Sequence, residues 1–96
     1  MQFIWDERKN RSNKAKHRVS FETAMLVFED PHHISRPDRV VDGELRWHTL
    51  GLVGGLQLLL VVHTVFELPG DGAETIRLIS ARKATPSERS IYAQDF

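Results

Sequence analysis

Apolar and polar residues alternate through the middle of the chain in the pattern of β-strands. Between Leu45 and Leu52 every second side chain falls on the same face, so that Arg46 and Trp47 face opposite ways. Leu56 to Phe66 is almost wholly apolar, which indicates a central strand covered on both faces. Thr75 to Ala81 is the last stretch with strand character. The pattern predicts three strands in this half of the chain.

Turns that contain glycine separate these strands. Asp42-Gly43 predicts a hairpin between a strand near Ile34–Val41 and the strand that carries Arg46. Gly54-Gly55 predicts a second turn, and strands joined this tightly form an antiparallel meander. The length of the second loop decides the register. A loop of two residues would place Arg46 opposite His63, whereas a loop of three residues would not.

Helix signals flank the strands on both sides. Asp6 and Ser20 are N-cap residues by type, and each precedes a helical stretch. The first helix, to about Lys16, carries few apolar residues and therefore belongs on the surface. The second has a buried stripe at positions i, i+3, i+4 and i+7, formed by Phe21, Ala24, Met25 and Phe28. The capping box Thr85-Pro86-Ser87-Glu88 starts a third helix that runs to about Ala93.

A short strand at Gln2–Trp5 precedes the first helix, which gives the order β-α-α-β-β-β-β-α. This order predicts an α+β fold in a single domain over residues 1–96. We expect a mostly antiparallel β-sheet with two N-terminal helices and one C-terminal helix.

The composition narrows the class of protein. The 96 residues include no cysteine, which excludes disulfides, thiolate metal sites and cysteine nucleophiles. The N-terminal segment is charged by its sixth residue, unlike a signal peptide, and the longest apolar run, Leu56–Val62, is too short to cross a bilayer. We therefore expect a soluble, cytoplasmic protein with no membrane partner.

The formal net charge of zero hides blocks of opposite sign. Residues 1–20 are mostly basic, residues 21–45 are mostly acidic, and residues 77–92 are basic again. Such blocks make a basic face and an acidic face on one small domain, and a basic face favours a polyanion as partner. The alternative is that each block is ordinary solvated surface.

Two common kinds of catalytic site find little support in the sequence. There is no G-x-S-x-G segment, and the serines at positions 20, 80 and 87 fit caps or strands. None of the five histidines has H-x-x-x-H or H-E-x-x-H spacing, so no metal ion or other cofactor is expected.

Cations near the strands predict a phosphate site. Arg46 and Arg77 interrupt apolar strands, whereas Arg82 and Lys83 follow the last strand at a helix N-terminus, where backbone amides attract anions. Arginine holds phosphate through two parallel hydrogen bonds, and these side chains converge if their strands are neighbours. Tyr92 adds an aromatic ring of the kind that stacks on bases. The alternative is that the strand arginines only face solvent.

Proton transfer requires a further group. His17 is the candidate, because histidine titrates near neutral pH, and the adjacent Lys16 would stabilise the charge of a phosphorane. The alternative for His17 is that it caps carbonyl groups at the end of the first helix.

Three segments, in this order, resemble the BrnT-type toxins, small ribonucleases of bacterial type II toxin–antitoxin modules. They are WDERKNRSNKAKHRVSFETA at 5–24, RWHTLGLVGGLQLLLVV at 46–62 and IRLISARKATPSERSIY at 76–92. The family pattern runs W-D-x-x-K-N-x-x-N-x-x-K-H, then S-F-E-x-A, then a strand arginine before an apolar strand, then I-S-A-R-x-A-T-x-x-E-x-x-x-Y. The segments span nearly the whole chain, which makes the resemblance specific.

The resemblance implies a RelE-like fold and cleavage of RNA without a metal ion and without the ribosome. It also implies an antitoxin partner with a ribbon-helix-helix domain, in a heterotetramer that binds operator DNA. The residues expected to act in catalysis are Lys16, His17, Arg46 and Arg82. The residues expected to contact the RNA substrate are Arg77, Lys83 and Tyr92.

Two positions depart from the family pattern. Arg18 stands where the family usually has glycine after K-H, so it must adopt a left-handed conformation or turn differently. The segment Thr64-Val65-Phe66 lacks an arginine that the family often has there, and Arg77 is a candidate to replace it. No carboxylate clearly serves as a base for this reaction.

The alternative function is that of a non-catalytic domain that binds RNA or docks a partner.

Overall fold

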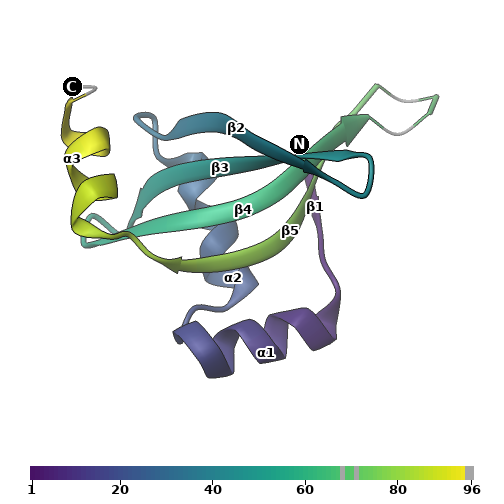
Figure 1. The fold of residues 1–96 in the computed structure, drawn as a ribbon. Coiled ribbons are helices and arrows are strands. Elements are labelled where there is room, and N and C mark those ends of the chain that lie inside the picture. Colours follow the sequence, from purple (N-terminus) through teal and green to yellow (C-terminus); the bar gives the residue numbers. More distant parts are fainter. Residues whose placement is uncertain (68, 71, 95–96) are drawn as a thin grey trace.

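The computed structural model describes residues 1–67, 69–70 and 72–94 as an α+β structure, which confirms the predicted class (Figure 1). The elements follow the predicted order, with a 3₁₀ helix, η1, added after the second helix. They are β1 (Gln2–Ile4), α1 (Glu7–His17), α2 (Phe21–Ala24), η1 (Met25–Glu29), β2 (Ile34–Val41), β3 (Glu44–Val53), β4 (Gln57–Glu67), β5 (Glu74–Lys83) and α3 (Pro86–Gln94). Within the described residues, no helix has the length and apolar character that spanning a membrane requires.

The described strands form a five-stranded sheet in the spatial order β1-β5-β4-β3-β2. Strands β2 to β5 are antiparallel neighbours, as expected for strands joined by short turns, and β1 adds a parallel strand beside β5. Val53 pairs with Gln57, so the turn at Gly54-Gly55 also contains Leu56. The loop of three residues is therefore the correct alternative, and His63 lies opposite Trp47 instead of Arg46.

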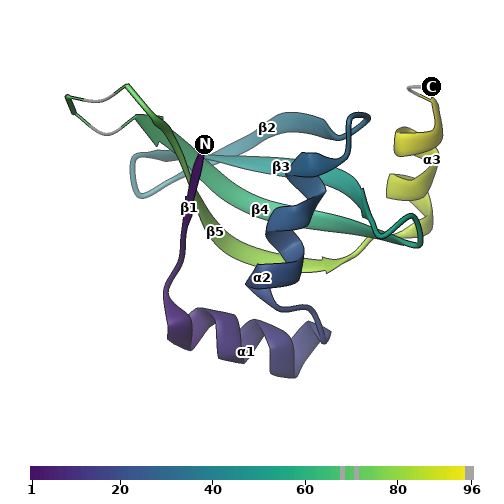
Figure 2. The same ribbon diagram turned by 180° about the vertical axis from the view of Figure 1, so that it is seen from behind.

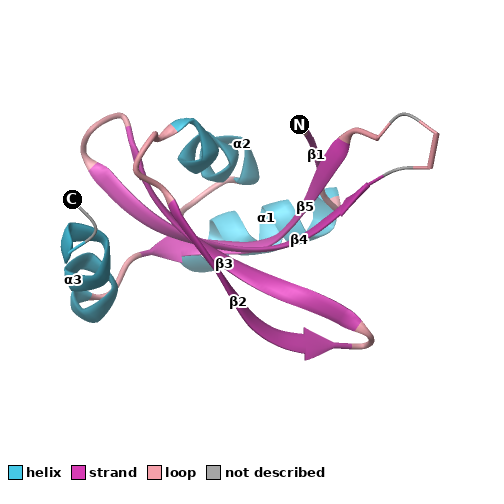
Figure 3. Ribbon diagram, turned by 90° about the horizontal axis from the view of Figure 1, so that it is seen from above, coloured by secondary structure: helices cyan, strands magenta, loops and turns pink. Residues whose placement is uncertain are grey.

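The two faces of the sheet are covered unequally. Helices α2 and η1 lie across one face, behind the sheet in Figure 1 and in front of it in Figure 2. The main core lies between them and the sheet, and its buried members are Val19, Phe21, Ala24, Val27, Leu59, Val61, Ile76, Leu78 and Ala81. Helix α3 packs at one end of the sheet, apart from α1 and α2 (Figure 3). We call the face opposite α2 the open face.

The end of the second helical segment differs from the prediction. The predicted stripe assumed one continuous α-helix, but the α-helix ends at Ala24 and the chain continues as η1. A 3₁₀ helix repeats every three residues, so Phe21, Ala24 and Val27 are the fully buried positions. Met25 and Phe28, which the stripe included, are only partly buried.

Close contact with β3 explains the position of Val27. A Cβ atom added to Gly51 would lie 2.6 Å from the Val27 Cβ, which is closer than real Cβ contacts allow. Glycine at position 51 therefore lets η1 approach the sheet closely enough to bury Val27.

Two buried asparagines attach α1 to the rest of the fold. The Asn13 side chain behaves like a strand partner for Ala81, because it accepts from the Ala81 N–H (3.1 Å) and donates to the Ala81 carbonyl (2.9 Å). It also donates to the Val19 carbonyl (2.8 Å). Asn10 accepts from the Phe21 N–H (2.8 Å). The Asn13 side chain thus continues the edge pairing of β5 where β1 has ended, whereas Asn10 connects α1 to the start of α2.

The chain reverses direction after α1 through a left-handed residue. Arg18 has a φ of 61° and donates its N–H to the Lys14 carbonyl. Of the two conformations that the sequence left open, Arg18 therefore adopts the left-handed one. For a residue with a Cβ this conformation costs about 1–2 kcal/mol.

Candidate active site

Charged side chains from β2 to β5 extend from the open face of the sheet. Residues paired across antiparallel strands point to the same face, and alternate residues along a strand do likewise. By this register the open face carries Arg36, Arg39, Arg46, Arg77 and Arg82, together with His48. The predicted phosphate site therefore has three of its four cations on a common surface.

A β-bulge brings Arg77 and Arg82 onto the same face. These arginines are five positions apart, and a regular strand would direct them to opposite faces. Ile79 is an extra residue in β5, where the pairing with β4 shifts by one position. Such bulges re-aim the side chains that follow them.

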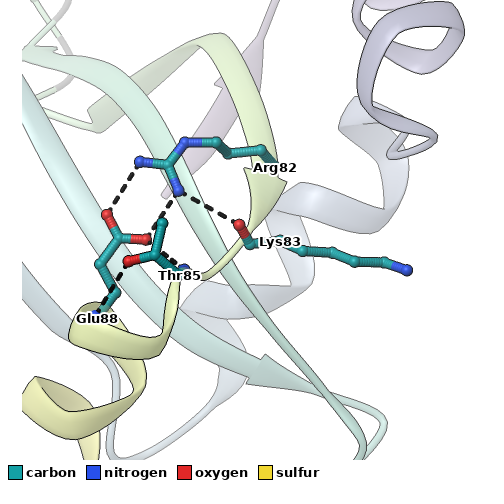
Figure 4. Close-up of polar contacts among 4 residues, drawn as sticks. All are labelled: Arg82, Lys83, Thr85 and Glu88. Atoms are coloured by element: carbon teal, nitrogen blue, oxygen red, sulfur yellow. Dashed lines mark hydrogen bonds and ion pairs between the residues drawn. The ribbon is translucent and has the colours of Figure 1, made fainter.

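Arg82 forms a bidentate ion pair with Glu88 of α3 (Figure 4). Its Nη1 and Nη2 atoms donate to the two carboxylate oxygens at 2.8 and 2.9 Å. Glu88 also accepts from the Thr85 N–H (2.9 Å), and Thr85 Oγ1 accepts from the Glu88 N–H (3.2 Å), which confirms the predicted capping box. The hydrogen bonds from Arg82 lower the pKa of Glu88 to about 2, and those to Glu88 raise the pKa of Arg82.

Replacing Glu88 with glutamine is expected to lower the stability at pH 7 by about 0.5–1 kcal/mol, because glutamine keeps the cap but loses the charge opposite Arg82. The pKa of Glu88 is lower in the folded state, about 2 against an ordinary 4.5. Its contribution is therefore fully present above pH 4.5 and is lost as the pH falls to about 2. Urea unfolding of both proteins at several pH values from about 2 to 7 measures this difference in the free energy of unfolding. The difference should vanish near pH 2. A difference that is the same at every pH would contradict the ion pair.

Lys83 does not accompany Arg82. Strand β5 continues through Lys83, two residues beyond the predicted end, so adjacent side chains alternate between faces. In Figure 4 the Lys83 side chain extends away from Arg82 and Glu88. The two cations that are neighbours in the sequence are therefore separated in space.

Arg46 differs from Arg77 and Arg82, the other partly buried arginines of the open face. Arg77 is paired through its Nη2 with Glu44, and Arg82 with Glu88. Within the described part of the chain, Arg46 has no ion pair, and its Nε is buried without a hydrogen-bond partner. A buried donor that lacks a partner is uncommon in folded proteins. Of the partly buried arginines on this face, Arg46 is therefore the one whose guanidinium has no carboxylate partner among the described residues, whereas Arg36, which also lacks an ion pair, is exposed.

The register separates Arg46 from Arg82. Arg82 pairs with Leu60 of β4, and Leu60 pairs with Leu50 of β3. Leu50 lies four residues from Arg46 along β3. Their backbones are thus about 13 Å apart along the strands and about 10 Å apart across them. Arg77 pairs with Thr64 of β4. Because Trp47 pairs with His63, the next residue of β3, Arg46, lies beside Thr64, so Arg46 and Arg77 are in the same row across the sheet. The structure brings Arg46 near Arg77 and places Arg82 beside α3.

Lys16 and His17 occupy the last turn of α1, beside the edge of β5. They line a shallow cleft of about 170 Å³ together with Ser80. Ser80 lies in the same row of the sheet as His48, two strands away. Lys16 and His17 therefore flank the open face at its β5 edge.

Tyr92 lies in the core. Its ring packs with Leu50 and Leu60, and only 7% of its surface is exposed. Its hydroxyl donates to the carboxylate of Asp30, which also accepts from the Leu52 N–H (2.8 Å). Burial and this contact raise the pKa of Tyr92 to about 12. This position suits attachment of α3 to the sheet and leaves no free ring face for a base.

Sequence reasoning missed a second feature of the open face. His48 and Asp38 line a cleft of about 220 Å³ between β2, β3 and α3, and Glu88 lines the same cleft. The His48 Nε2 lies 3.3 Å from the Asp38 Oδ2. Strand alternation already placed His48 on the face of Arg46, which was the available signal. The contact with Asp38 depends on a bulge that the sequence does not show directly.

The described residues were expected to hold no metal ion. In that part of the chain, no group of three or more histidine and carboxylate side chains lies close enough together to hold a metal ion. His48 and Asp38 of the cleft are a pair, and no third histidine or carboxylate among the described residues lies close enough to complete a metal site with them.

Comparison with known proteins adds independent information. The sequence model of the family described as "Ribonuclease toxin, BrnT, of type II toxin-antitoxin system" matches residues 5–88. The crystal structure of the Brucella abortus ribonuclease toxin BrnT at 1.1 Å is similar, with a TM-score of 0.59 and 24% sequence identity over 88% of this chain and 97% of that chain. At that identity the likeness concerns the fold. No curated protein matches the sequence.

Proposed function

Because the chain belongs to the BrnT family of ribonuclease toxins of type II toxin–antitoxin systems, we propose that its open face cleaves RNA without a metal ion and without the ribosome. One observation carries the location of the site. Arg46 presents a guanidinium with no ion pair among the described residues, on a face that α3 covers only at one end. An unpaired guanidinium in such a position favours the binding of a phosphate.

The proposed reaction is internal transfer at a phosphodiester. The ribose 2′-oxygen attacks the adjacent phosphorus, the bond to the 5′-oxygen breaks, and the products are a 2′,3′-cyclic phosphate and a 5′-hydroxyl. Negative charge increases on the phosphate oxygens in the transition state. Arg46 would stabilise that charge, since a donor aimed at developing charge acts more strongly in a partly buried site than in water.

The remaining cations would position the RNA. Arg77 lies in the row of Arg46, so it would contact the same or the next phosphate. Arg82 would contact a more distant phosphate, in exchange for part of its pairing with Glu88. Lys16 and His17 would contribute charge or a proton at the β5 edge, as the family pattern implies.

An antitoxin partner follows from the family. We propose that it has a ribbon-helix-helix domain, covers the open face, and forms with this chain a cytoplasmic heterotetramer that binds operator DNA. The support for this arrangement is the resemblance of the chain to the BrnT-type toxins.

A cleavage assay tests the proposed function. The purified protein is incubated with total RNA, with and without EDTA, and the products are separated on a denaturing gel and tested for cyclic phosphate ends. Cleavage that EDTA leaves unchanged, with cyclic phosphate ends, is expected. RNA binding without products would favour a non-catalytic RNA-binding domain, and neither binding nor products would favour a domain that only docks a partner.

A further inference from the structure

Resting on the proposed function, we propose that His48, held by Asp38, is the general base that accepts the proton of the attacking ribose 2′-hydroxyl. The sequence identified no proton acceptor for this reaction. His48 lies two residues from Arg46 on the same face of β3, a spacing of about 7 Å between their backbones. A phosphate held by Arg46 would thus place the adjoining ribose within reach of the imidazole.

A bulge in β2 brings the carboxylate of Asp38 to His48. Pro37 pairs with Trp47, while Arg39 pairs with Arg46, so Asp38 is an extra residue between them. In a regular strand Arg39 would face away from the open face, and the bulge re-aims this segment. Bulges of this kind are frequent next to active sites.

The carboxylate of Asp38 approaches one of the two ring nitrogens of His48. Asp38 Oδ2 lies 3.3 Å from His48 Nε2, and the same oxygen lies 3.3 Å from Arg39 Nε. A carboxylate beside Nε2 favours the tautomer with its proton on that atom, which leaves the lone pair of Nδ1 available. Both side chains are 35% exposed, so a ribose can approach them from solvent.

The other ionisable groups around the cleft are poorer acceptors. Glu88 from α3 is held in its bidentate pair with Arg82, and its pKa of about 2 makes it a weak base. Arg36 from β2 and Arg46 from β3 are cations. His63 of β4 lies on the opposite face of the sheet, against Phe28, and burial lowers its pKa to about 4. His48 is the remaining group of this set that lines the cleft and has a ring nitrogen able to accept a proton.

The 2′-oxygen forms a bond to phosphorus while its proton passes to Nδ1 of His48. The bond from phosphorus to the 5′-oxygen breaks, and the leaving oxygen takes a proton from water. The imidazolium that results is stabilised by the carboxylate of Asp38 and returns its proton to solvent.

The test uses a short single-stranded RNA that the wild-type protein cuts once, and the same RNA with a 2′-deoxyribose at the cut. His48→Gln is expected to lower kcat by about 10²–10⁴-fold, the usual contribution of a general base. It should bind the deoxy RNA as tightly as the wild type, and it should lose the rise in kcat with pH that a histidine base produces. The matched control is His32→Gln, a change at an exposed histidine of the loop before β2, which should leave rate and pH profile unchanged.

Two further variants separate chemistry from structure. Added imidazole should restore part of the activity of His48→Ala, which a merely structural role would not allow. Asp38→Asn should lose activity, while its circular dichroism spectrum should show that the fold is kept. Equal rates and pH profiles for wild type and His48→Gln would overturn this proposal alone. Absence of cleavage by the wild-type protein would remove the proposed function, and this proposal with it.

Discussion

Replacing Arg46 with alanine is expected to lower the rate of RNA cleavage by roughly 10²–10³-fold, the usual effect of removing one donor from a transition-state site. The reason is that Arg46, whose guanidinium is partly buried, has no carboxylate partner among the described residues, whereas Arg77 and Arg82 are neutralised by Glu44 and Glu88. The loss should appear mainly in kcat, since the charge on the phosphate oxygens increases in the transition state. Single-turnover cleavage of a short RNA at saturating protein measures it.

Two variants control for charge and for folding. Arg46→Lys keeps the charge but loses the paired donors of the guanidinium, so it should regain only part of the rate. Arg8→Ala removes an exposed arginine from the first turn of α1 and should cleave like the wild type. Because part of Arg46 is buried, thermal unfolding must show that Arg46→Ala is folded at the assay temperature. A folded Arg46→Ala protein that cleaves at the wild-type rate would exclude Arg46 from the site.

The sequence predicted the fold well because its signals are local. Strand alternation, turn glycines and helix caps each depend on a few neighbouring residues, and they agreed on the α+β order that the structure confirms. The length of the Gly54 turn was not decided by such signals. Two-residue and three-residue loops both accept glycine, and only the pairing of Val53 with Gln57 selects between them.

The candidate site was harder to predict because two bulges shape it. Counting residues along a regular β5 would place Arg77 and Arg82 on opposite faces, and the extra Ile79 reverses that result. In β2 the extra Asp38 creates the contact with His48, which the sequence analysis left out. A bulge depends on how two distant strands settle against each other, so the sequence of one strand does not specify it.

Tyr92 and Glu88 illustrate a different difficulty. Both match positions of the family pattern, and a pattern does not distinguish residues that hold the fold from residues that touch the substrate. Tyr92 is in the core with its hydroxyl on Asp30, and Glu88 pairs with Arg82 while capping α3. Burial and hydrogen bonds separate these two kinds of residue, and both become visible only in three dimensions.

Asn13 is the strongest case of a motif residue that we expect to serve the fold. Asn13→Ala should lower the free energy of unfolding by about 2–4 kcal/mol, because it leaves the N–H and carbonyl of Ala81 and the carbonyl of Val19 without their buried partner. That is a large part of the 5–15 kcal/mol that stabilises an ordinary domain. Urea unfolding at pH 7 measures the change.

The contrast with catalysis makes this prediction specific. Ser12→Ala, at the exposed neighbouring position of α1, should change the stability by no more than about 0.5 kcal/mol. Asn13→Asp should be as harmful as Asn13→Ala, because a carboxylate still accepts from the Ala81 N–H but repels the two carbonyl oxygens that the amide group contacts. Below its unfolding temperature, Asn13→Ala should keep a kcat close to that of the wild type, since the hydrogen bonds of this side chain go to backbone groups. A fully stable Asn13→Ala protein that has lost cleavage would show instead that this asparagine acts on the RNA.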